Sequence, residues 1–220
     1  TIRMAEKLDD DQTHILHNQY GQLLLTQRGP VAAAKHYALG VQKKYEYSQG
    51  HNNLASSLER RGYKKVAAKH YALSLQYDYK SPVAHNNYAL LLASRGDAKL
   101  AAKHFAQSIR IAPNSFVHHS NYSCLLRDRG DLDKAAKHAA KTLQLTSDQP
   151  KAHFRYALIL KMRGNRRLAA KHFALTLQLL QPIRPNSIFY QRYSEMMDKP
   201  DYSNRERENY ATTINTTVNQ

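Results

Sequence analysis

Cysteine and tryptophan are nearly missing from this chain of 220 residues, in which Cys124 is the single cysteine and tryptophan does not occur. One cysteine excludes an internal disulfide and leaves the redox compartment undetermined. Stability must therefore come from packing.

Long apolar runs are missing as well. No stretch of about 18 apolar residues occurs, which argues against a membrane span, and the N-terminus shows no basic segment followed by an apolar one. The chain starts at Thr1 rather than Met, so a removed leader or a truncated start stays open. The sequence favours a soluble cytoplasmic protein, with a mature secreted form as the alternative.

Acidic residues are scarce, since 17 Asp and Glu stand against 33 Lys and Arg and give a formal net charge of +16. Such a surface attracts acidic partners through a long-range, salt-sensitive interaction. An acidic protein, RNA, a lipid head group and an acidic glycan all satisfy this condition, and charge alone does not choose among them.

A motif that returns every 34 residues dominates the rest of the sequence. Ala-Ala-Lys-His occurs five times, with its lysine at Lys35, Lys69, Lys103, Lys137 and Lys171. A histidine column keeps the same step at His17, His51, His85, His119 and His153. A fixed period of this size is typical of stacked supersecondary units, none of which buries its apolar face alone. Function should then lie on a surface rather than in a pocket.

The period predicts how the chain is divided. Residues 1–13 form a short N-terminal segment, residues 184–198 a helix that caps the last repeat, and residues 199–220 a polar tail. The five repeats occupy residues 14–47, 48–81, 82–115, 116–149 and 150–183.

Each repeat reads as two helices joined by a tight turn. In the third repeat, Pro82 suits the first turn of a helix because its missing N–H would be unpaired there in any case. Gly96 tolerates the left-handed conformation that ends helices, and Asp97 can cap the next helix. Apolar residues three and four positions apart give each helix a stripe to bury.

Small and aromatic residues recur at fixed places in these helices. The first helices hold a small residue at Gly21, Ala55, Ala89, Ser123 and Ala157 and a leucine at Leu24, Leu58, Leu92, Leu126 and Leu160. The second helices hold Ala33, Ala67, Ala101, Ala135 and Ala169, followed four residues later by Tyr37, Tyr71, Phe105, Ala139 and Phe173. Together with the spacing, this pattern resembles the tetratricopeptide repeat over about three quarters of the chain.

The resemblance implies an all-α, right-handed superhelical solenoid of five repeats that acts as a non-catalytic protein-interaction scaffold. Three departures stand out. The histidine column replaces the family's aromatic residue, the closing proline is in register only at Pro113, and the first turn, Arg28-Gly29-Pro30, comes one residue late. Ala139, where the family has an aromatic residue, predicts looser packing in the fourth repeat.

A polar column lies two residues beyond the histidines, with asparagine in the middle three repeats. Its members are Gln19, Asn53, Asn87, Asn121 and Arg155. The column resembles the asparagine ladder of O-GlcNAc-transferase-like and kinesin-light-chain-like repeats, where amides on the inner wall hold the backbone of a bound peptide. A side-chain amide suits this role because it both donates to a backbone C=O and accepts from a backbone N–H. The neighbouring residues expected to line the groove are Asn52, Asn86, Leu90, Cys124, Phe154 and Leu158. The alternative is a polar inner face that the repeats merely inherited.

Histidines invite comparison with a metal site or a pH sensor. Members of one column lie a whole repeat apart and do not share an ion. His14 and His17 are three residues apart and His118 adjoins His119, but neither pair brings the further ligands that zinc needs. We therefore expect the histidines to fill packing positions, with no metal and no cofactor.

The lysine of each motif is expected on a solvated outer face. Leu39, Leu73 and Leu175 follow it by four residues, where a polar side chain would be usual, and thus predict an outer contact face for another copy or a larger assembly. A thin N-terminal cap also favours head-to-tail association. A structural subunit of a filament or large complex is therefore the second interpretation.

The sequence supports other functions less strongly. No zinc-finger spacing, RNP-like run or phosphate loop supports nucleic acid binding, so a basic binder of RNA or acidic glycan ranks third. No nucleophile has a base at a convincing spacing, which predicts no catalytic residue. Asn121 and Asn215 fit the N-glycosylation pattern, with Asn215 the better acceptor, and Asn121 does not serve as both glycan site and ladder rung.

Overall fold

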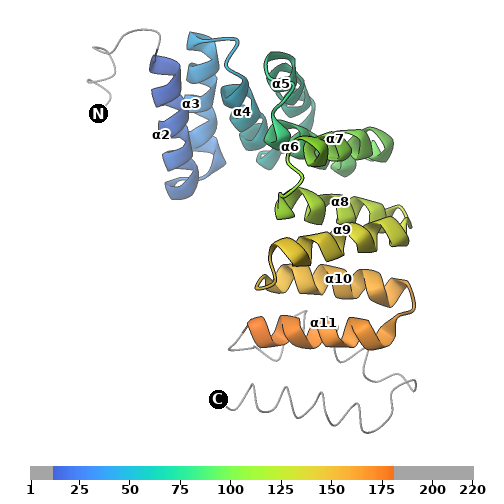
Figure 1. Ribbon diagram of the computed structural model, residues 1–220. Coiled ribbons are helices and arrows are strands. Elements are labelled where there is room, and N and C mark those ends of the chain that lie inside the picture. Colours follow the sequence, from blue (N-terminus) through green and yellow to red (C-terminus); the bar gives the residue numbers. More distant parts are fainter. Residues whose placement is uncertain (1–11, 181–220) are drawn as a thin grey trace. The chain divides into compact units, whose positions relative to one another are not determined.

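The computed structural model describes residues 12–180, and every helix or strand in that part of the chain is an α-helix (Figure 1). The chain divides into two compact units, Thr1–Pro113 and Asn114–Gln220. The described helices of the first unit are α2 (Thr13–Gln27), α3 (Pro30–Lys43), α4 (Ser48–Arg60), α5 (Lys64–Tyr77), α6 (Pro82–Ser94) and α7 (Ala98–Ile111). Those of the second unit are α8 (Phe116–Asp128), α9 (Leu132–Leu145), α10 (Pro150–Met162) and α11 (Arg166–Leu179).

Consecutive helices pack side by side within each unit. In the first unit α2 packs on α3, α4 on α5 and α6 on α7, while α4 also contacts both α2 and α6. In the second unit α8 packs on α9 and α10 on α11, while α8 contacts α10. The first helices of neighbouring repeats therefore lie next to one another within a unit, which is the arrangement that a row of polar side chains on those helices requires.

The core follows the small and aromatic columns. The alanines of the second helices, Ala33, Ala67, Ala101, Ala135 and Ala169, are all 0% exposed. The aromatic side chains four residues later are buried against them, as Phe105 illustrates at 1% exposure. Ala139 occupies the same place in the fourth repeat and is also buried, in a cluster completed by Tyr122 and Tyr156. Small residues thus let the helix pairs approach, and rings fill the space between them.

A glycine with positive φ marks the turn inside every described repeat. The φ angles are 86° at Gly62 and 88° at Gly96, and no atom lies within 4 Å of a Cβ built at either residue. The constraint is therefore conformational, because L side chains rarely adopt this region. After Gly96, the N–H of Asp97 donates to the carbonyl of Leu92 and closes the helix end. The first turn differs, since Gly29 directly precedes Pro30 at the start of α3.

The helix caps depart from the expectation at one residue. Asp97 stands at the N-cap of α7 as predicted, yet its side chain makes no cap hydrogen bond. Serines do so instead at the first helices: Ser81 Oγ accepts from the N–H of Ala84, and Ser115 Oγ accepts from the N–H of His118. Pro82 lies in the first turn of α6, as its missing N–H favours.

Several expectations fall on residues that the structure does not describe. These are residues 1–11, the capping helix at 184–198, and the tail at 199–220 with Asn215. Among the described helices, none is long and apolar enough to cross a membrane.

Candidate peptide-binding surfaces

The asparagines of the first unit form a continuous line of amide hydrogen bonds. Asn53 on α4 donates through Nδ2 to Asn18 Oδ1 on α2, 2.8 Å away, and Asn87 on α6 donates to Asn52 Oδ1, 3.1 Å away. Within each helix, Asn52 Nδ2 donates to Asn53 Oδ1 at 3.2 Å and Asn86 Nδ2 to Asn87 Oδ1 at 3.3 Å. The line therefore ties three first helices together.

Asn18 belongs to this line although the sequence reasoning passed over it. It is 3% exposed and lies one residue before Gln19. Its place in the repeat is that of Asn52 and Asn86, which are 8% and 4% exposed. The 34-residue step from Asn52 back to Asn18 would have found it.

The line leaves hydrogen-bonding capacity for a ligand. A side-chain amide has two N–H donors and two acceptor lone pairs. Asn53 uses one donor toward Asn18 and one lone pair toward Asn52, and its side chain is only partly buried. One donor and one acceptor thus remain on the same amide, which is the pair that an extended peptide backbone requires.

A hollow of about 590 Å³ opens beside the line in the first unit. Its lining is mostly polar and comes from α2, α4, α6 and the chain between helices: Gln22, Tyr47, Ser48, Gln49, Asn52, Asn53, Asp78, Ser81 and Val83. Asp78 is the only charged residue among them. Leu90 lies on α6 with an exposure of 40%, so an apolar side chain is available on the same helix as Asn87.

The second unit has its own hollow at the corresponding column. It measures about 190 Å³ and is lined by Phe116, Val117, Ser120, Asn121, Thr142, Gln149, Lys151, Ala152 and Arg155. Arg155 Nη1 donates to Ser120 Oγ at 2.5 Å. This contact corresponds to the link between Asn53 and Asn18 in the first unit, because the two residues of each contact are 35 positions apart. The charge differs, since Lys151 and Arg155 make this hollow basic.

The other expected groove residues have a packing role as well. Phe154 meets Phe173 edge to face with ring centroids 5.6 Å apart, and Leu158 packs against the same buried cluster. Cys124 is partly exposed. Gln19 is exposed on α2. The structure thus brings Asn52, Asn53 and Asn87 into one network, while Phe154 and Leu158 also belong to the edge of the core.

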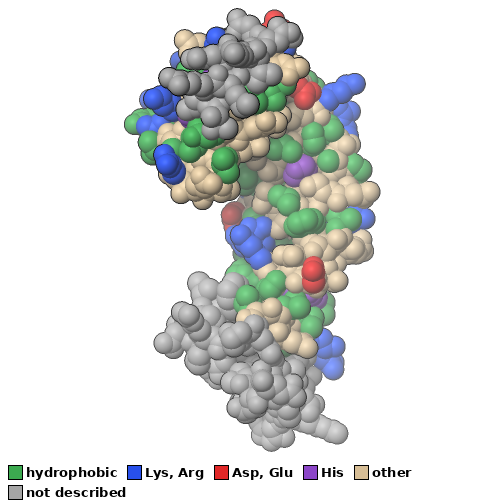
Figure 2. Space-filling model, turned by 90° about the vertical axis from the view of Figure 1, so that its left-hand side faces the viewer, with side chains coloured by type: hydrophobic (Ala, Val, Ile, Leu, Met, Phe, Trp, Pro, Cys, Tyr) green, Lys and Arg blue, Asp and Glu red, His purple; other side chains and the backbone are tan. Residues whose placement is uncertain are grey.

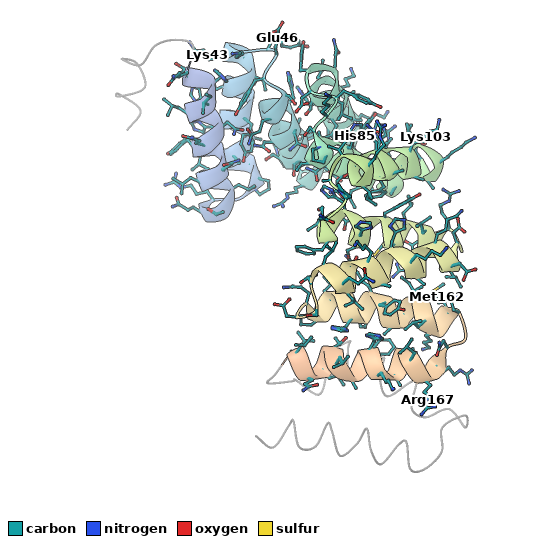
Figure 3. All side chains as sticks on the ribbon, viewed as in Figure 1. Lys43, Glu46, His85, Lys103, Met162 and Arg167 are labelled. Carbon is teal, nitrogen blue, oxygen red and sulfur yellow. The ribbon has the colours of Figure 1, made fainter. Side chains whose placement is uncertain are left out.

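Each described repeat joins its two histidines in a pair. The first-helix histidine lies 19 residues before its partner, and the Nδ1 atoms are 2.9 Å apart in His51 with His70, His85 with His104, and His153 with His172. The distance is 2.8 Å in His119 with His138 and 3.4 Å in His17 with His36. Figure 3 labels His85, which lies on α6 facing α7.

In the pairs of His51, His85 and His153, a backbone carbonyl decides which nitrogen bears the proton. His85 Nε2 lies 2.9 Å from the carbonyl oxygen of Tyr79, and His51 makes the same contact with Tyr45 at 2.7 Å. A carbonyl oxygen only accepts, so Nε2 of His85 must donate. In the neutral ring Nδ1 of His85 is then the acceptor, and Nδ1 of His104 donates to it.

Burial favours the neutral form of three second-helix histidines. Burial, aided by the charge that His85 would carry, lowers the pKa of His104 to about 4. The pKa values of His138 and His172 fall to about 4 for the same reasons, with His119 and His153 as the neighbours. The expected packing role of the first-helix histidines agrees with this geometry. No group of three or more metal-ligating side chains occurs among the residues from 12 to 180.

The lysines of the repeated motif are all exposed. They are Lys35, Lys69, Lys103, Lys137 and Lys171. Figure 3 shows Lys103 pointing away from α7, and on the face shown in Figure 2 basic side chains (blue) are more frequent than acidic ones (red). Leu175 is 39% exposed, whereas Leu39 and Leu73 are half-buried. The apolar outer face is thus uneven along the chain.

Comparison with solved structures identifies the fold of this chain. No protein-family model and no curated protein sequence matches the chain. The PilF protein of Pseudomonas aeruginosa superposes with a TM-score of 0.71 at 17% identity, over 84% of this chain and 98% of that one. TTC0263, a tetratricopeptide repeat protein of Thermus thermophilus, gives 0.67 at 15% identity over 84% and 98%. The chain has the tetratricopeptide repeat fold.

A third neighbour shares the fold and has a known ligand class. YrrB, described as a tetratricopeptide repeat protein with an unusual peptide-binding site, gives a TM-score of 0.65 at 13% identity over 88% of this chain and 97% of that one. At these identities the likeness establishes the tetratricopeptide architecture and leaves the ligand of this chain to its own side chains.

Proposed function

We propose that the chain is a non-catalytic protein-interaction scaffold whose asparagine line binds the backbone of an extended peptide. The observation that carries the proposal is the amide network of Asn18, Asn52, Asn53, Asn86 and Asn87 beside a polar hollow. Repeats stack roughly 10 Å apart, so one repeat corresponds to about three residues of extended chain at ~3.3 Å each. Contacts to a backbone make such a surface tolerant of ligand sequence.

The second unit supports the same role with different chemistry. Asn121 and Arg155 line its hollow together with the exposed Phe116 and Val117. Here we expect the partner to present apolar and acidic side chains, whereas the first unit reads mainly backbone. Gln19 is the outermost member of the column on α2 and would extend the first surface by one contact.

The amides have a second role that any test must separate from binding. Each link joins neighbouring first helices, so removing one changes the packing of repeats as well as the surface. A net contribution of about 1 kcal/mol per hydrogen bond is typical. Loss of ligand affinity therefore has to exceed what a small loss of stability explains.

A selected peptide provides the test. Peptides are first selected from a random displayed library on the full chain, and the Kd of the best one is measured by fluorescence anisotropy with wild type and Asn53→Ala. We expect the substitution to raise Kd about tenfold, as the loss of ~1.4 kcal/mol requires. Gln76→Ala, an exposed amide on α5, is the matched control and should leave Kd unchanged.

Unchanged affinity of the selected peptide for Asn53→Ala and Asn87→Ala, with both variants folded by circular dichroism, would show that the asparagines only hold the repeats together.

A further inference from the structure

A groove on the outer side of the first unit gathers three positive side chains. It encloses about 350 Å³ and lies between α5 and α6, away from the asparagine line. Its lining consists of Lys65, Ala68, Lys69, Ala72, Tyr88 and Arg95. None of these is acidic, and none of the three cations forms an ion pair with a carboxylate in the described part of the chain.

Two of the cations share one face of α5, and the third approaches from α6. Lys65 and Lys69 are one turn apart, so their side chains project to the same side of the helix. Arg95 stands at the C-terminal cap of α6. The small Ala68 and Ala72 leave room between them. Three like charges around one concavity repel one another unless an anion is bound.

The same positions in the second unit can be compared with this groove, because the sequence repeats. The residues that correspond to Lys65 and Arg95 in the second unit are Asp133 and Arg163, two repeats further on. Arg163 Nη2 lies 2.7 Å from Asp133 Oδ1, so this unit provides the carboxylate itself. The second unit thus shows that an arginine at this place binds a carboxylate, and the first unit has a lysine where that carboxylate would be.

We propose that the groove of Lys65, Lys69 and Arg95 binds an aspartate or glutamate side chain of a partner protein. The guanidinium of Arg95 offers a planar fork that fits a carboxylate through two hydrogen bonds, and the two ammonium groups add charge from the other side. The floor of Ala68, Ala72 and the Tyr88 ring accommodates a short apolar neighbour of the acid. This surface is separate from the asparagine line and stands or falls independently of it.

Nucleic acid fits the groove less well. The ring of Tyr88 is already engaged, with its centroid 4.9 Å from that of His104 and 6.0 Å from that of Tyr71, so it offers no free platform for a base. A phosphate backbone also needs a continuous row of cations. The row is interrupted in the second unit, where Asp133 replaces the lysine. A local carboxylate is the better match.

Charge reversal at the two corresponding positions tests the proposal. The probe is a short fluorescein-labelled peptide of alternating glutamate and alanine, titrated with the full chain at low salt and followed by anisotropy. Lys65→Asp copies the second unit by supplying an internal partner for Arg95, and should raise Kd about tenfold. Asp133→Lys creates a second cationic groove and should lower the apparent Kd about twofold. Because Lys65 and Asp133 are exposed, neither change threatens the fold.

The controls separate this groove from overall charge and from the asparagine line. Lys80→Asp changes the net charge of the first unit as much as Lys65→Asp does and lies outside the groove, so it should alter Kd less than about twofold. The tenfold loss caused by Lys65→Asp should be the same on the Asn53→Ala background as in the wild-type chain, because the two surfaces are separate. Equal losses for Lys65→Asp and Lys80→Asp would overturn the proposal, as would tighter, Lys65-dependent binding of a labelled oligothymidylate than of the peptide.

Discussion

The two units share a core and differ in the side chains that face a ligand. Both keep the buried alanine column, the glycine turns and the histidine pairs at the same steps. Their hollows differ in sign, with Asp78 in the first and Lys151 and Arg155 in the second. The link between first helices is amide to amide in the first unit and guanidinium to hydroxyl in the second.

This difference shows which positions the fold constrains. A histidine pair fills space between the helices of one repeat and is bonded to the backbone, so exchanging either ring disturbs both helices. The polar column two residues further on is bounded by solvent on one side, so several side chains satisfy it. The repeats thus keep their packing residues constant and vary the residues that face a ligand.

The largest expected effect concerns the histidine pairs, which both units share. Above pH 6.5 the second-helix histidines are neutral in the folded and unfolded chain. Between pH 6.5 and about 4 the unfolded chain binds protons that folded His104, His138 and His172 refuse, so stability falls as the pH falls through this range. After allowance for their partial exposure we expect a loss of about 1–2 kcal/mol for each ring by pH 4.

Thermal unfolding followed by circular dichroism over this pH range measures the effect. Because His104 belongs to the first unit and His172 to the second, both units should lose stability over the same range. A melting temperature that stays constant between neutral pH and about pH 4.5 would contradict the neutral-pair description.

A smaller effect is expected from substitutions in the aromatic column of the core, where the fourth repeat differs from the others. Phe105 is 1% exposed, and Phe105→Ala should lower the free energy of unfolding by about 3–5 kcal/mol through lost burial and a cavity. The fourth repeat already has Ala139 at this place, where Tyr122 and Tyr156 complete the cluster. Urea denaturation compares the variant with Ala139→Gly, for which we expect about 1 kcal/mol from helix propensity. Similar losses for the two would mean that the aromatic column does not support the core.

The sequence predicted the architecture because its period is strict. The 34-residue step, the glycine turns and the proline at Pro82 all agree with one another, so local and long-range patterns point to the same helices. The exposed lysine column also followed from the pattern. What was wrong was the cap at Asp97, because a residue at the N-cap position does not guarantee a side-chain hydrogen bond.

The site was only partly predictable for a geometric reason. The two histidine columns were compared within themselves, and their pairing across 19 residues depends on how two antiparallel helices cross. The links from Asn18 to Asn53 and from Asn52 to Asn87 join different positions of consecutive repeats, so no single column reveals them. The binding role of the whole column, Gln19, Asn53, Asn87, Asn121 and Arg155, stays a prediction.

The smallest expected effect concerns the ion pair between Arg163 and Asp133 in the second unit. Arg163 and Asp133 have side chains that are 40% and 80% exposed, so solvent weakens their attraction. Arg163→Ala should change the free energy of unfolding by less than about 0.5 kcal/mol in urea denaturation. A loss of several kcal/mol would mean that the pair is structural, and that the lysine at the corresponding place lowers the stability of the first unit.

The most direct test of the peptide-binding claim observes the amides themselves. The side-chain amide signals of asparagine and glutamine are recorded by ¹⁵N-resolved NMR while the full chain is titrated with a library-selected peptide, and are assigned by substitution. We expect the signals of Asn52, Asn53 and Asn87 to shift together and to saturate with the peptide, while the signal of Gln76 on α5 stays in place. Saturable binding that leaves the three asparagine signals unmoved would contradict it.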